Sequence, residues 1–121
     1  MQIAQKNFYK KFLGRIGEKK AVEYLKKQGY KILEKNFKTH VGEIDIIGLE
    51  KDVVCFIEVK TRSGDEYGQP SEAVNRKKQE KYFKVAEGYL LSKGLTEKEC
   101  RFDVVEIERE KINLIKDAFW R

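Results

Sequence analysis

Four charged side chains interrupt two runs of sequence that otherwise have the composition of buried strands. Glu43 and Asp45 stand among isoleucines in GEIDII. Glu58 and Lys60 end the apolar part of VVCFIEVK. Two partly buried carboxylates repel each other when they lie side by side, and a bound cation relieves the repulsion. Oxygen ligands without a neighbouring Cys or His favour Mg²⁺ or Mn²⁺ over zinc, so Asp45 and Glu58 are candidate ligands of a divalent cation.

Lys60 adds a positive charge beside this candidate centre, because it stands two residues after Glu58 and shares its face in a strand. A divalent cation polarises a phosphate and lowers the pKa of a bound water, while an ammonium group stabilises developing negative charge or orients that water. The combination predicts phosphodiester hydrolysis. A solvated Glu58–Lys60 pair, or a cross-strand ion pair between Glu43 and Lys60, explains the same residues without any catalysis.

The two strands must form a hairpin for Asp45 and Glu58 to meet. If the turn consists of Lys51 and Asp52, the residues on either side of it pair, and Asp45 then lies opposite Glu58. The turn lacks the favoured Asn-Gly signal, and a slip of one residue would carry Asp45 to the other face of the sheet. The geometry of the predicted centre therefore depends on this register.

Side chains alternate along a strand, which predicts the residues that share a face. Glu43, Asp45 and Ile47 are expected together on one face of their strand. Ile44 and Ile46 are expected on the other face. The VVCFIEVK run is apolar on both faces for most of its length, which is typical of a strand in the middle of a sheet.

Apolar spacing predicts a first helix over about residues 7–28, with Phe12 and Ile16 on its apolar stripe and Gly29 as its C-terminal stop. A second helix is expected to start after an N-cap at Ser71 and to end before a glycine. The order of elements is α-β-β-β-α-β-β, which favours an α/β or α+β sandwich of a mixed sheet with helices packed on it. The strand-like runs are YKILEKNF, GEIDIIGL, VVCFIEVKT, RFDVVEIE and INLIKDAF.

A third acid lies in the first helix. Glu18 stands three positions before Ala21 and seven before Leu25, which puts it on the core-facing stripe. A carboxylate on a buried face needs a partner. The acids and the lysine of the strands are one candidate partner, and Arg15 in the same helix is another.

Composition limits the classes of protein that fit. The chain has 121 residues, which suits a single domain over residues 1–121. Lys and Arg number 26 against 20 Asp and Glu, and this net charge of +6 suits either a polyanionic partner or a soluble protein with a mildly basic surface. The two cysteines lack metal-site spacing, and no run is typical of a membrane span or a signal peptide, so we expect a cytoplasmic protein without a membrane partner.

These residues belong to a longer pattern. An acid in the first helix, an Asp in the second strand and Glu-x-Lys in the third resemble the active-site pattern of the PD-(D/E)xK nuclease superfamily. From about residue 8 to 108 the chain is most similar to the YraN-like bacterial proteins and, more distantly, to archaeal Holliday junction resolvases. The matching stretches are GRIGE at 14–18, GEIDII at 42–47, FIEVKTR at 56–62, YGQPSEAV at 67–74, KQ at 78–79 and FDVV at 102–105.

The resemblance implies a restriction-endonuclease-like α/β fold with a central mixed β-sheet flanked by helices. It also implies a metal ion, Mg²⁺ or Mn²⁺, held by Asp45, Glu58 and the backbone carbonyl of Val59. Lys60 would lie near the attacking water, and Glu18 would match the helix-borne acid of the resolvases. The Pro-Asp pair that names the superfamily is absent, because an isoleucine precedes the Asp here.

The function that the resemblance implies is a metal-dependent endonuclease acting on DNA, including branched or recombination and repair intermediates, with a homodimer expected by analogy. The alternative is a catalytically silent module that binds nucleic acid or recruits a partner. Basic and polar side chains around the centre are candidate phosphate contacts, and each of them also fits a solvated surface. These candidates are Arg15, Arg62, Arg76, Lys77, Lys78 and Gln79.

Overall fold

The computed structural model describes residues 2–62 and 75–120 of the chain, with side chains from Lys11 onward in the first helix. The elements follow the predicted order of helix, three strands, helix and two strands. They are α1 (Gln2–Lys27), β1 (Tyr30–Lys38), β2 (Glu43–Glu50), β3 (Val53–Arg62), α2 (Arg76–Lys93), β4 (Glu99–Glu108) and β5 (Lys111–Phe119).

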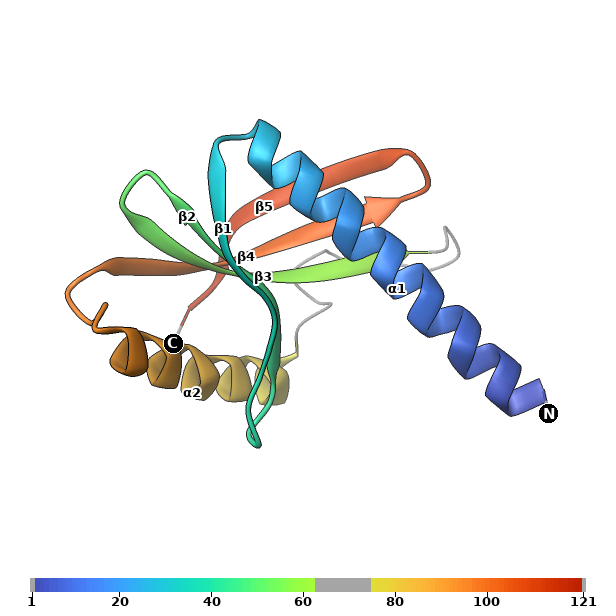
Figure 1. The fold of residues 1–121 in the computed structure, drawn as a ribbon, viewed down its shortest axis with the longest axis horizontal. Coiled ribbons are helices and arrows are strands. Elements are labelled where there is room, and N and C mark those ends of the chain that lie inside the picture. The colour runs from blue at the N-terminus through green and yellow to red at the C-terminus, as the bar shows by residue number, and fades with distance from the viewer. Residues whose placement is uncertain (1, 63–74, 121) are drawn as a thin grey trace.

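The strands form one sheet in the order β1-β2-β3-β4-β5 (Figure 1). Neighbouring strands are antiparallel except β3 and β4, which run parallel. Parallel neighbours need a crossover connection, and α2 lies in it. The predicted α/β class with a mixed sheet is therefore confirmed, and β3 is the central strand, as its apolar residues on both faces indicate.

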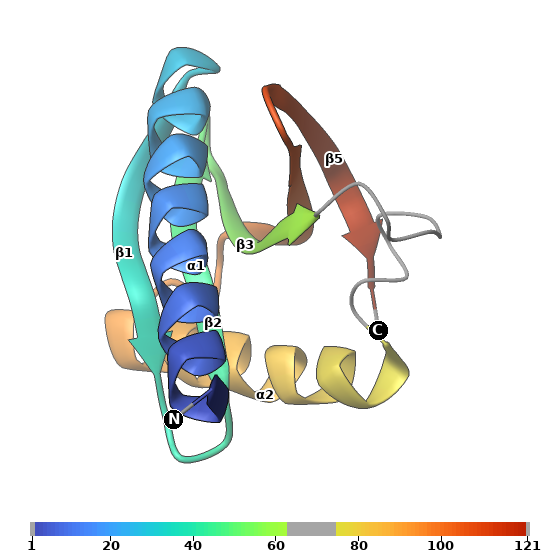
Figure 2. The same cartoon turned by 90° about the vertical axis from the view of Figure 1, so that its right-hand side faces the viewer.

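The two helices pack on opposite faces of the sheet (Figures 1 and 2). Phe56 of β3 points to the face that α2 covers and meets Tyr89 edge to face, with ring centroids 6.1 Å apart. The next residue, Ile57, points to the other face and belongs to one buried cluster with Leu25 of α1. Burial of each such side chain stabilises the fold by roughly 1.5–3 kcal/mol. The sheet thus has a core on both sides, which holds β3 firmly in the centre.

The N-terminal half of α1 extends beyond the sheet (Figure 1). The placement of Phe12 and Ile16 on the core-facing stripe is wrong, because their side chains are 51% and 37% exposed. Ile16 and Ala21 are five residues apart, so they point in directions about 140° apart, and only Ala21 faces the sheet. No helix in the described ranges is both long enough and apolar enough to cross a membrane.

The second helix begins later than predicted. Its N-cap is Asn75, whose side chain accepts a hydrogen bond from the Lys78 N–H, and the helix starts at Arg76. Ser71, the predicted N-cap, lies outside the described residues. The helix ends at Gly94 in the left-handed conformation, which glycine adopts at little cost. The start of α2 matters for the site, because its first turn faces the carboxylates.

A buried carboxylate ties the sheet together on the face that α1 covers. Asp103 of β4 is wholly buried and accepts hydrogen bonds from the Tyr30 hydroxyl (3.0 Å), the Arg101 Nε (2.9 Å) and the Asp117 N–H (2.9 Å). Arg101 also forms an ion pair with Glu50. Buried charges are tolerated when they are paired and hydrogen-bonded, so this network joins β1, β2, β4 and β5 without leaving Asp103 unsatisfied.

α1 approaches β3 closely at a glycine. A Cβ atom at Gly17 would overlap the Thr61 Oγ1, whereas a Cβ atom at Gly14 would meet no atom of the described residues within 4 Å. Both glycines weaken the helix relative to alanine. The close contact with Thr61 explains why position 17 is a glycine, and position 14 has no such contact among the described residues.

Gly14→Ala should raise the free energy of unfolding by about 0.5–1 kcal/mol, because alanine is the better helix former. Gly17→Ala should fail to gain this stability, because its methyl group displaces Thr61. In a Thr61→Ala background the same Gly17→Ala change should become favourable. Urea denaturation followed by circular dichroism measures all three differences. Equal gains from both glycine substitutions in the wild-type background would contradict the close approach.

Candidate metal centre

The hairpin between β2 and β3 has the register that the sequence predicts. Its turn contains Lys51 in the left-handed conformation, with a φ of 55°. Pairing runs from the residues that flank the turn to Ile46 and Ile57. Asp45 and Glu58 come next in this register, so they lie where the paired part of the hairpin ends.

Asp45 bonds to β3 through its side chain instead of its backbone. Its Oδ2 accepts a hydrogen bond of 2.8 Å from the Val59 N–H. The N–H and C=O of one strand residue point to the same neighbouring strand, so the Val59 carbonyl also faces the side of Asp45. The three groups predicted to bind a metal, two carboxylates and this carbonyl, are therefore neighbours at the end of the hairpin.

The alternation predicted for the start of β2 is wrong. Ile44 and Ile47 both belong to the cluster under α2, whereas Ile46 belongs to the cluster under α1. The opposite position in β1, Asn36, has a left-handed φ of 53°, so the ladder is distorted on both strands. This distortion places Asp45 between the two faces of the sheet, where it lines a cleft on each side.

The pKa of Asp45 is raised to about 7, and burial is the largest cause. The negative charge of Glu58 adds to the effect, and so does a hydrogen bond between the two carboxyl groups. The Val59 N–H and the positive charge of Lys78 act in the opposite direction. Two carboxylates in one partly buried place repel each other, and a cation between them would relieve that repulsion.

Lys78 supplies a positive charge to this pair. Its Nζ lies 2.7 Å from the Glu58 Oε1, and the Glu58 side chain is only 9% exposed. Lys78 belongs to the first turn of α2, and its N-cap Asn75 lines the same cleft. The positive end of the α2 dipole therefore lies beside the carboxylates as well. From the sequence alone, Lys78 could equally have pointed to solvent.

A cleft of about 460 Å³ opens over the carboxylates on the side of α2. We call it the α2 cleft. Acids of the β2–β3 hairpin and lysines of α2 both contribute to its wall, so its charges are mixed. The charged residues that line it are Glu43, Asp45, Glu58, Lys77, Lys78 and Lys81.

A second cleft, of about 430 Å³, reaches Asp45 from the side of α1. We call it the α1 cleft. Glu18 lines it, so the third predicted acid lies near the centre, although on the other side of Asp45 from the α2 cleft. Burial raises the pKa of Glu18, and the charge of Asp45 raises it further. A hydrogen bond with Asn36 lowers it, Glu43 raises it and Lys38 lowers it.

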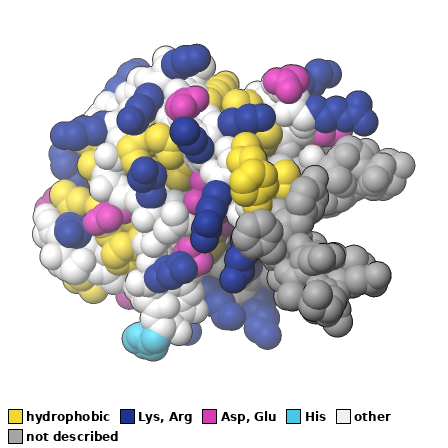
Figure 3. Space-filling model, turned by 45° about the vertical axis from the view of Figure 1, so that its right-hand side comes forward, with side chains coloured by type: hydrophobic (Ala, Val, Ile, Leu, Met, Phe, Trp, Pro, Cys, Tyr) yellow, Lys and Arg dark blue, Asp and Glu magenta, His cyan; other side chains and the backbone are white. Residues whose placement is uncertain are grey.

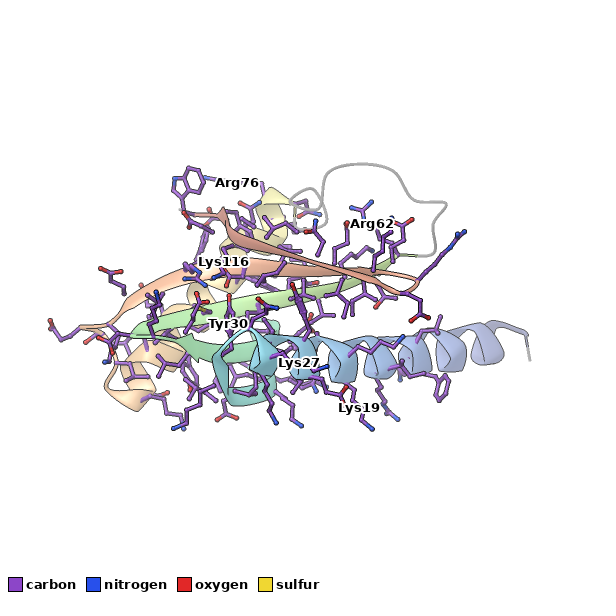
Figure 4. All side chains as sticks on the ribbon, turned by 90° about the horizontal axis from the view of Figure 1, so that it is seen from above. Lys19, Lys27, Tyr30, Arg62, Arg76 and Lys116 are labelled. Carbon is purple, nitrogen blue, oxygen red and sulfur yellow. The ribbon has the colours of Figure 1, made fainter. Side chains whose placement is uncertain are left out.

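Lys60 and Arg62 follow Glu58 on the same face of β3. Lys60 is half-buried. Arg62, labelled in Figure 4, is only 8% exposed. It forms an ion pair with Glu106 of β4. Arg62 thus contributes to the sheet, and Lys60 is the more exposed of the two.

The other predicted contacts lie on the helices. Arg76 and Lys77 are exposed in the first turn of α2, and the Arg76 Nε is 3.8 Å from the Glu80 Oε1. Gln79 is half-buried on the same helix. Arg15 is exposed on α1 and lines the α1 cleft. The predicted phosphate contacts are therefore divided between two helices on opposite sides of Asp45.

The donors fit a hard divalent cation that has few protein ligands. Among the described residues, no group of three or more His, Cys, Asp and Glu side chains is arranged to hold an ion. A centre here would use the Asp45 and Glu58 carboxylates and the Val59 carbonyl, with Glu18 outside the ligand set. Mg²⁺ typically takes one or two carboxylates and completes its shell with water and substrate phosphate, which matches this arrangement.

Two asparagines near the centre were not predicted as functional. Asn75 caps α2, and an Asn before a run of helix-forming residues is a recognisable N-cap signal. Asn36 hydrogen-bonds with Glu18 and distorts β1. Asparagine tolerates the left-handed conformation better than most residues, but nothing else in the YKILEKNF run indicates a bend there.

The fold and the centre define a class of protein, a mixed α/β sheet with an acidic centre at the end of its central hairpin. Sequence comparison gives the family. A family model described as "Uncharacterised protein family UPF0102" matches residues 17–107. The chain belongs to this family, and the match includes every residue of the centre.

Relatives are similar along nearly their whole length. A UPF0102 protein of Caldanaerobacter subterraneus subsp. tengcongensis is 47% identical over 121 residues, which cover 94% of this chain and 99% of the relative. One from Clostridium tetani is 50% identical over 119 residues, with coverages of 93% and 98%. One from Acetivibrio thermocellus is 47% identical over 128 residues, with both coverages at 98%. The names of these proteins state the family and no activity.

Asp45→Asn should stabilise the folded protein at pH 8 and change little near pH 4. Asp45 keeps its proton up to about pH 7 when the protein is folded, whereas in the unfolded chain it loses the proton near pH 4. Folding therefore takes up a proton between these values, and wild-type stability falls as the pH rises through this window. A shift of about three pKa units corresponds to a gain of up to about 4 kcal/mol at pH 8, measured by urea denaturation at pH 4, 6 and 8. Asp52→Asn, in the turn of the same hairpin, is the matched control, and an Asp45→Asn effect that does not vary with pH would contradict the assignment.

Lys78→Met should destabilise the protein at pH 7 by about 1–2 kcal/mol, because it leaves the buried Glu58 carboxylate without its cation. Lys77→Met, which removes the neighbouring lysine from the same cleft, should cost much less. Thermal unfolding measures both variants with and without Mn²⁺. The added cation should restore more stability to Lys78→Met than to Lys77→Met, and equal behaviour of the two variants would count against the Lys78–Glu58 contact.

Proposed function

We propose that the protein is a metal-dependent endonuclease that hydrolyses phosphodiester bonds of DNA, with branched or recombination and repair intermediates as its substrates. The observation that carries this proposal is the pairing of Asp45 with Glu58 at the end of the central hairpin, where burial and mutual repulsion raise the pKa of Asp45. Carboxylates with perturbed pKa values cluster at functional sites, and these oxygen ligands suit Mg²⁺ or Mn²⁺ as the cofactor.

The order of the acids along the chain supports the nuclease class. The resemblance to the PD-(D/E)xK superfamily rests on Glu18, Asp45, Glu58 and Lys60. The restriction-endonuclease-like fold that it implies agrees with the order of helices and strands. Membership of UPF0102 carries no activity by itself, so the support comes from the residues of the centre and not from the family name.

Each residue of the centre has a role in this proposal. Asp45, Glu58 and the Val59 carbonyl would hold the cation, and the cation would polarise a phosphate and lower the pKa of a bound water. Lys60 orients that water and stabilises the negative charge that develops as the water oxygen bonds to phosphorus. The bond from phosphorus to the leaving sugar oxygen breaks. The attacking water gives up a proton to solvent, and the leaving oxygen takes up a proton from solvent. Glu18 positions Asp45 from the side of α1.

The basic residues of α2 bind the substrate backbone. Lys78 neutralises Glu58 in the protein alone, and when a cation takes over that task the ammonium group can contact a phosphate. Lys77, Arg76 and Gln79 extend the same surface along the first turn of α2. Arg62 acts indirectly, because its ion pair with the neighbouring strand keeps the end of β3 in place.

Cleavage of labelled linear, flapped and four-way DNA in the presence of Mg²⁺ or Mn²⁺ tests the proposal. The wild-type protein should cut at least one of these substrates. Glu58→Gln and Lys60→Met should each lower the rate by about 100-fold or more while the protein stays folded, as judged by circular dichroism. Lys31→Met and Glu99→Gln, at exposed positions away from the centre, should retain the wild-type rate.

Full cleavage by both Glu58→Gln and Lys60→Met would place the activity outside this centre. Salt-sensitive binding without cleavage of any substrate would instead support the alternative of a catalytically silent binding module. The homodimer expected by analogy with the resolvases stays a prediction, which light scattering at several protein concentrations can check.

A further inference from the structure

One side of α1 carries a row of basic side chains. Lys11, Arg15, Lys19 and Lys26 are separated by four, four and seven residues, and all four are exposed. Residues three, four or seven apart lie on the same side of a helix, so these side chains form one line. We call them the basic row.

The basic row leads to the carboxylate centre. Its members Arg15, Lys19 and Lys26 line the α1 cleft, where Lys35 of β1 joins them. Two acids of α1, Glu18 and Glu23, line the same cleft, so its charges are mixed and its cations outnumber the acids of the helix. Asp45 lies in the wall of the same cleft. The basic row therefore begins on the part of α1 that extends beyond the sheet and continues as far as the predicted metal ligand.

A second group of cations approaches Asp45 from the opposite side. Lys77, Lys78 and Lys81 line the α2 cleft, whose wall also contains Asp45. Asp45 is thus the point where the basic surfaces of two helices meet. In the space-filling view, Lys and Arg side chains outnumber Asp and Glu on the face shown (Figure 3), in line with the net charge of +6.

The length of the basic row can be compared with that of a nucleic acid. Fifteen residues separate Lys11 from Lys26, and at 1.5 Å per residue this is about 22 Å along the helix axis. A DNA duplex rises 3.4 Å per base pair, so this length corresponds to about six base pairs. Scattered lysines would contact only one or two phosphates. A row of this length suits the extended phosphate backbone of a nucleic acid.

We infer that the basic row binds the phosphate backbone of a duplex arm on the α1 side of the centre, while the lysines of α2 contact the backbone on the other side. The inference rests on the proposed function and deepens it. A substrate held on both sides of Asp45 has nucleic acid on both sides of the bond to be cut, so the protein selects internal positions rather than strand ends. About six base pairs of duplex on the α1 side are needed for full affinity.

The same helix provides a matched control. Lys20 and Lys27 have the same separation as Lys19 and Lys26, but each is one residue further along and points about 100° away. They line a different groove, beside Tyr24. Figure 4 shows Lys19 and Lys27 leaving α1 in different directions. The double variants Lys19→Gln/Lys26→Gln and Lys20→Gln/Lys27→Gln therefore remove the same charge with the same spacing along the helix. They differ in the side of α1 from which the charge is removed.

Binding of a fluorescent 30-base-pair DNA duplex tests the inference. The full-length protein is used with Glu58→Gln in all samples and EDTA in place of divalent cations, so that binding is measured without cleavage. The slope of log K against log salt concentration is negative, and it should become less steep by about 1.8 in Lys19→Gln/Lys26→Gln. Each lost phosphate contact reduces its magnitude by about 0.9. The slope for Lys20→Gln/Lys27→Gln should stay at the value of the parent protein.

Equal slopes for the two double variants would overturn the inference, and so would salt-independent binding by the parent protein. The inference also requires that duplexes shorter than about six base pairs bind more weakly than the 30-base-pair duplex. Failure of the nuclease proposal would appear separately, as absence of cleavage by the wild-type protein with Mg²⁺ or Mn²⁺. Circular dichroism and thermal unfolding confirm that both double variants fold.

Discussion

The hydrogen bond from the Val59 N–H to the Asp45 carboxylate is the contact on which the centre depends. The backbone pairing between β2 and β3 ends just before this point. The Val59 N–H of β3 is still hydrogen-bonded there, because a side-chain oxygen of β2 takes the place of a backbone carbonyl. The same bond holds Asp45 beside Glu58, in a position where both carboxylates lose water. The end of the β2–β3 backbone pairing and the repulsion between the two carboxylates therefore occur at the same place. Each of them costs free energy of folding.

The surroundings of this pair moderate the conflict without removing it. Lys78 and the positive end of α2 lie on one side, and Glu18 adds a further negative charge on the other. The balance leaves Asp45 with a pKa close to neutral, which means that small changes in nearby charge alter its protonation. Under the proposed function, a divalent cation bound at this centre would replace both a proton and an ion pair.

The sequence predicted the order of the elements and the hairpin register, because a polar turn at Lys51 determines which residues of the two strands pair. It failed where a local signal is weak or absent. The phase of the apolar pattern changes after Ile16, and helical spacing by itself does not say which part of α1 meets the sheet. Asn36 distorts β1 through contacts with residues distant in sequence. Lys78 has a side chain long enough to reach either solvent or Glu58, so only the packing of α2 decides between them.

The Asp103 network has a consequence for the history of the family. It lies on the face opposite to Glu58, and Tyr30 and Arg101 satisfy it without any help from the centre. One small sheet thus holds two sets of charged residues that do not share a member, the Asp103 network and the proposed centre. A lineage can lose the acids of the centre by drift and still inherit the fold, or keep them under selection while the network is unchanged. Shared ancestry across the family therefore predicts shape more reliably than it predicts catalysis.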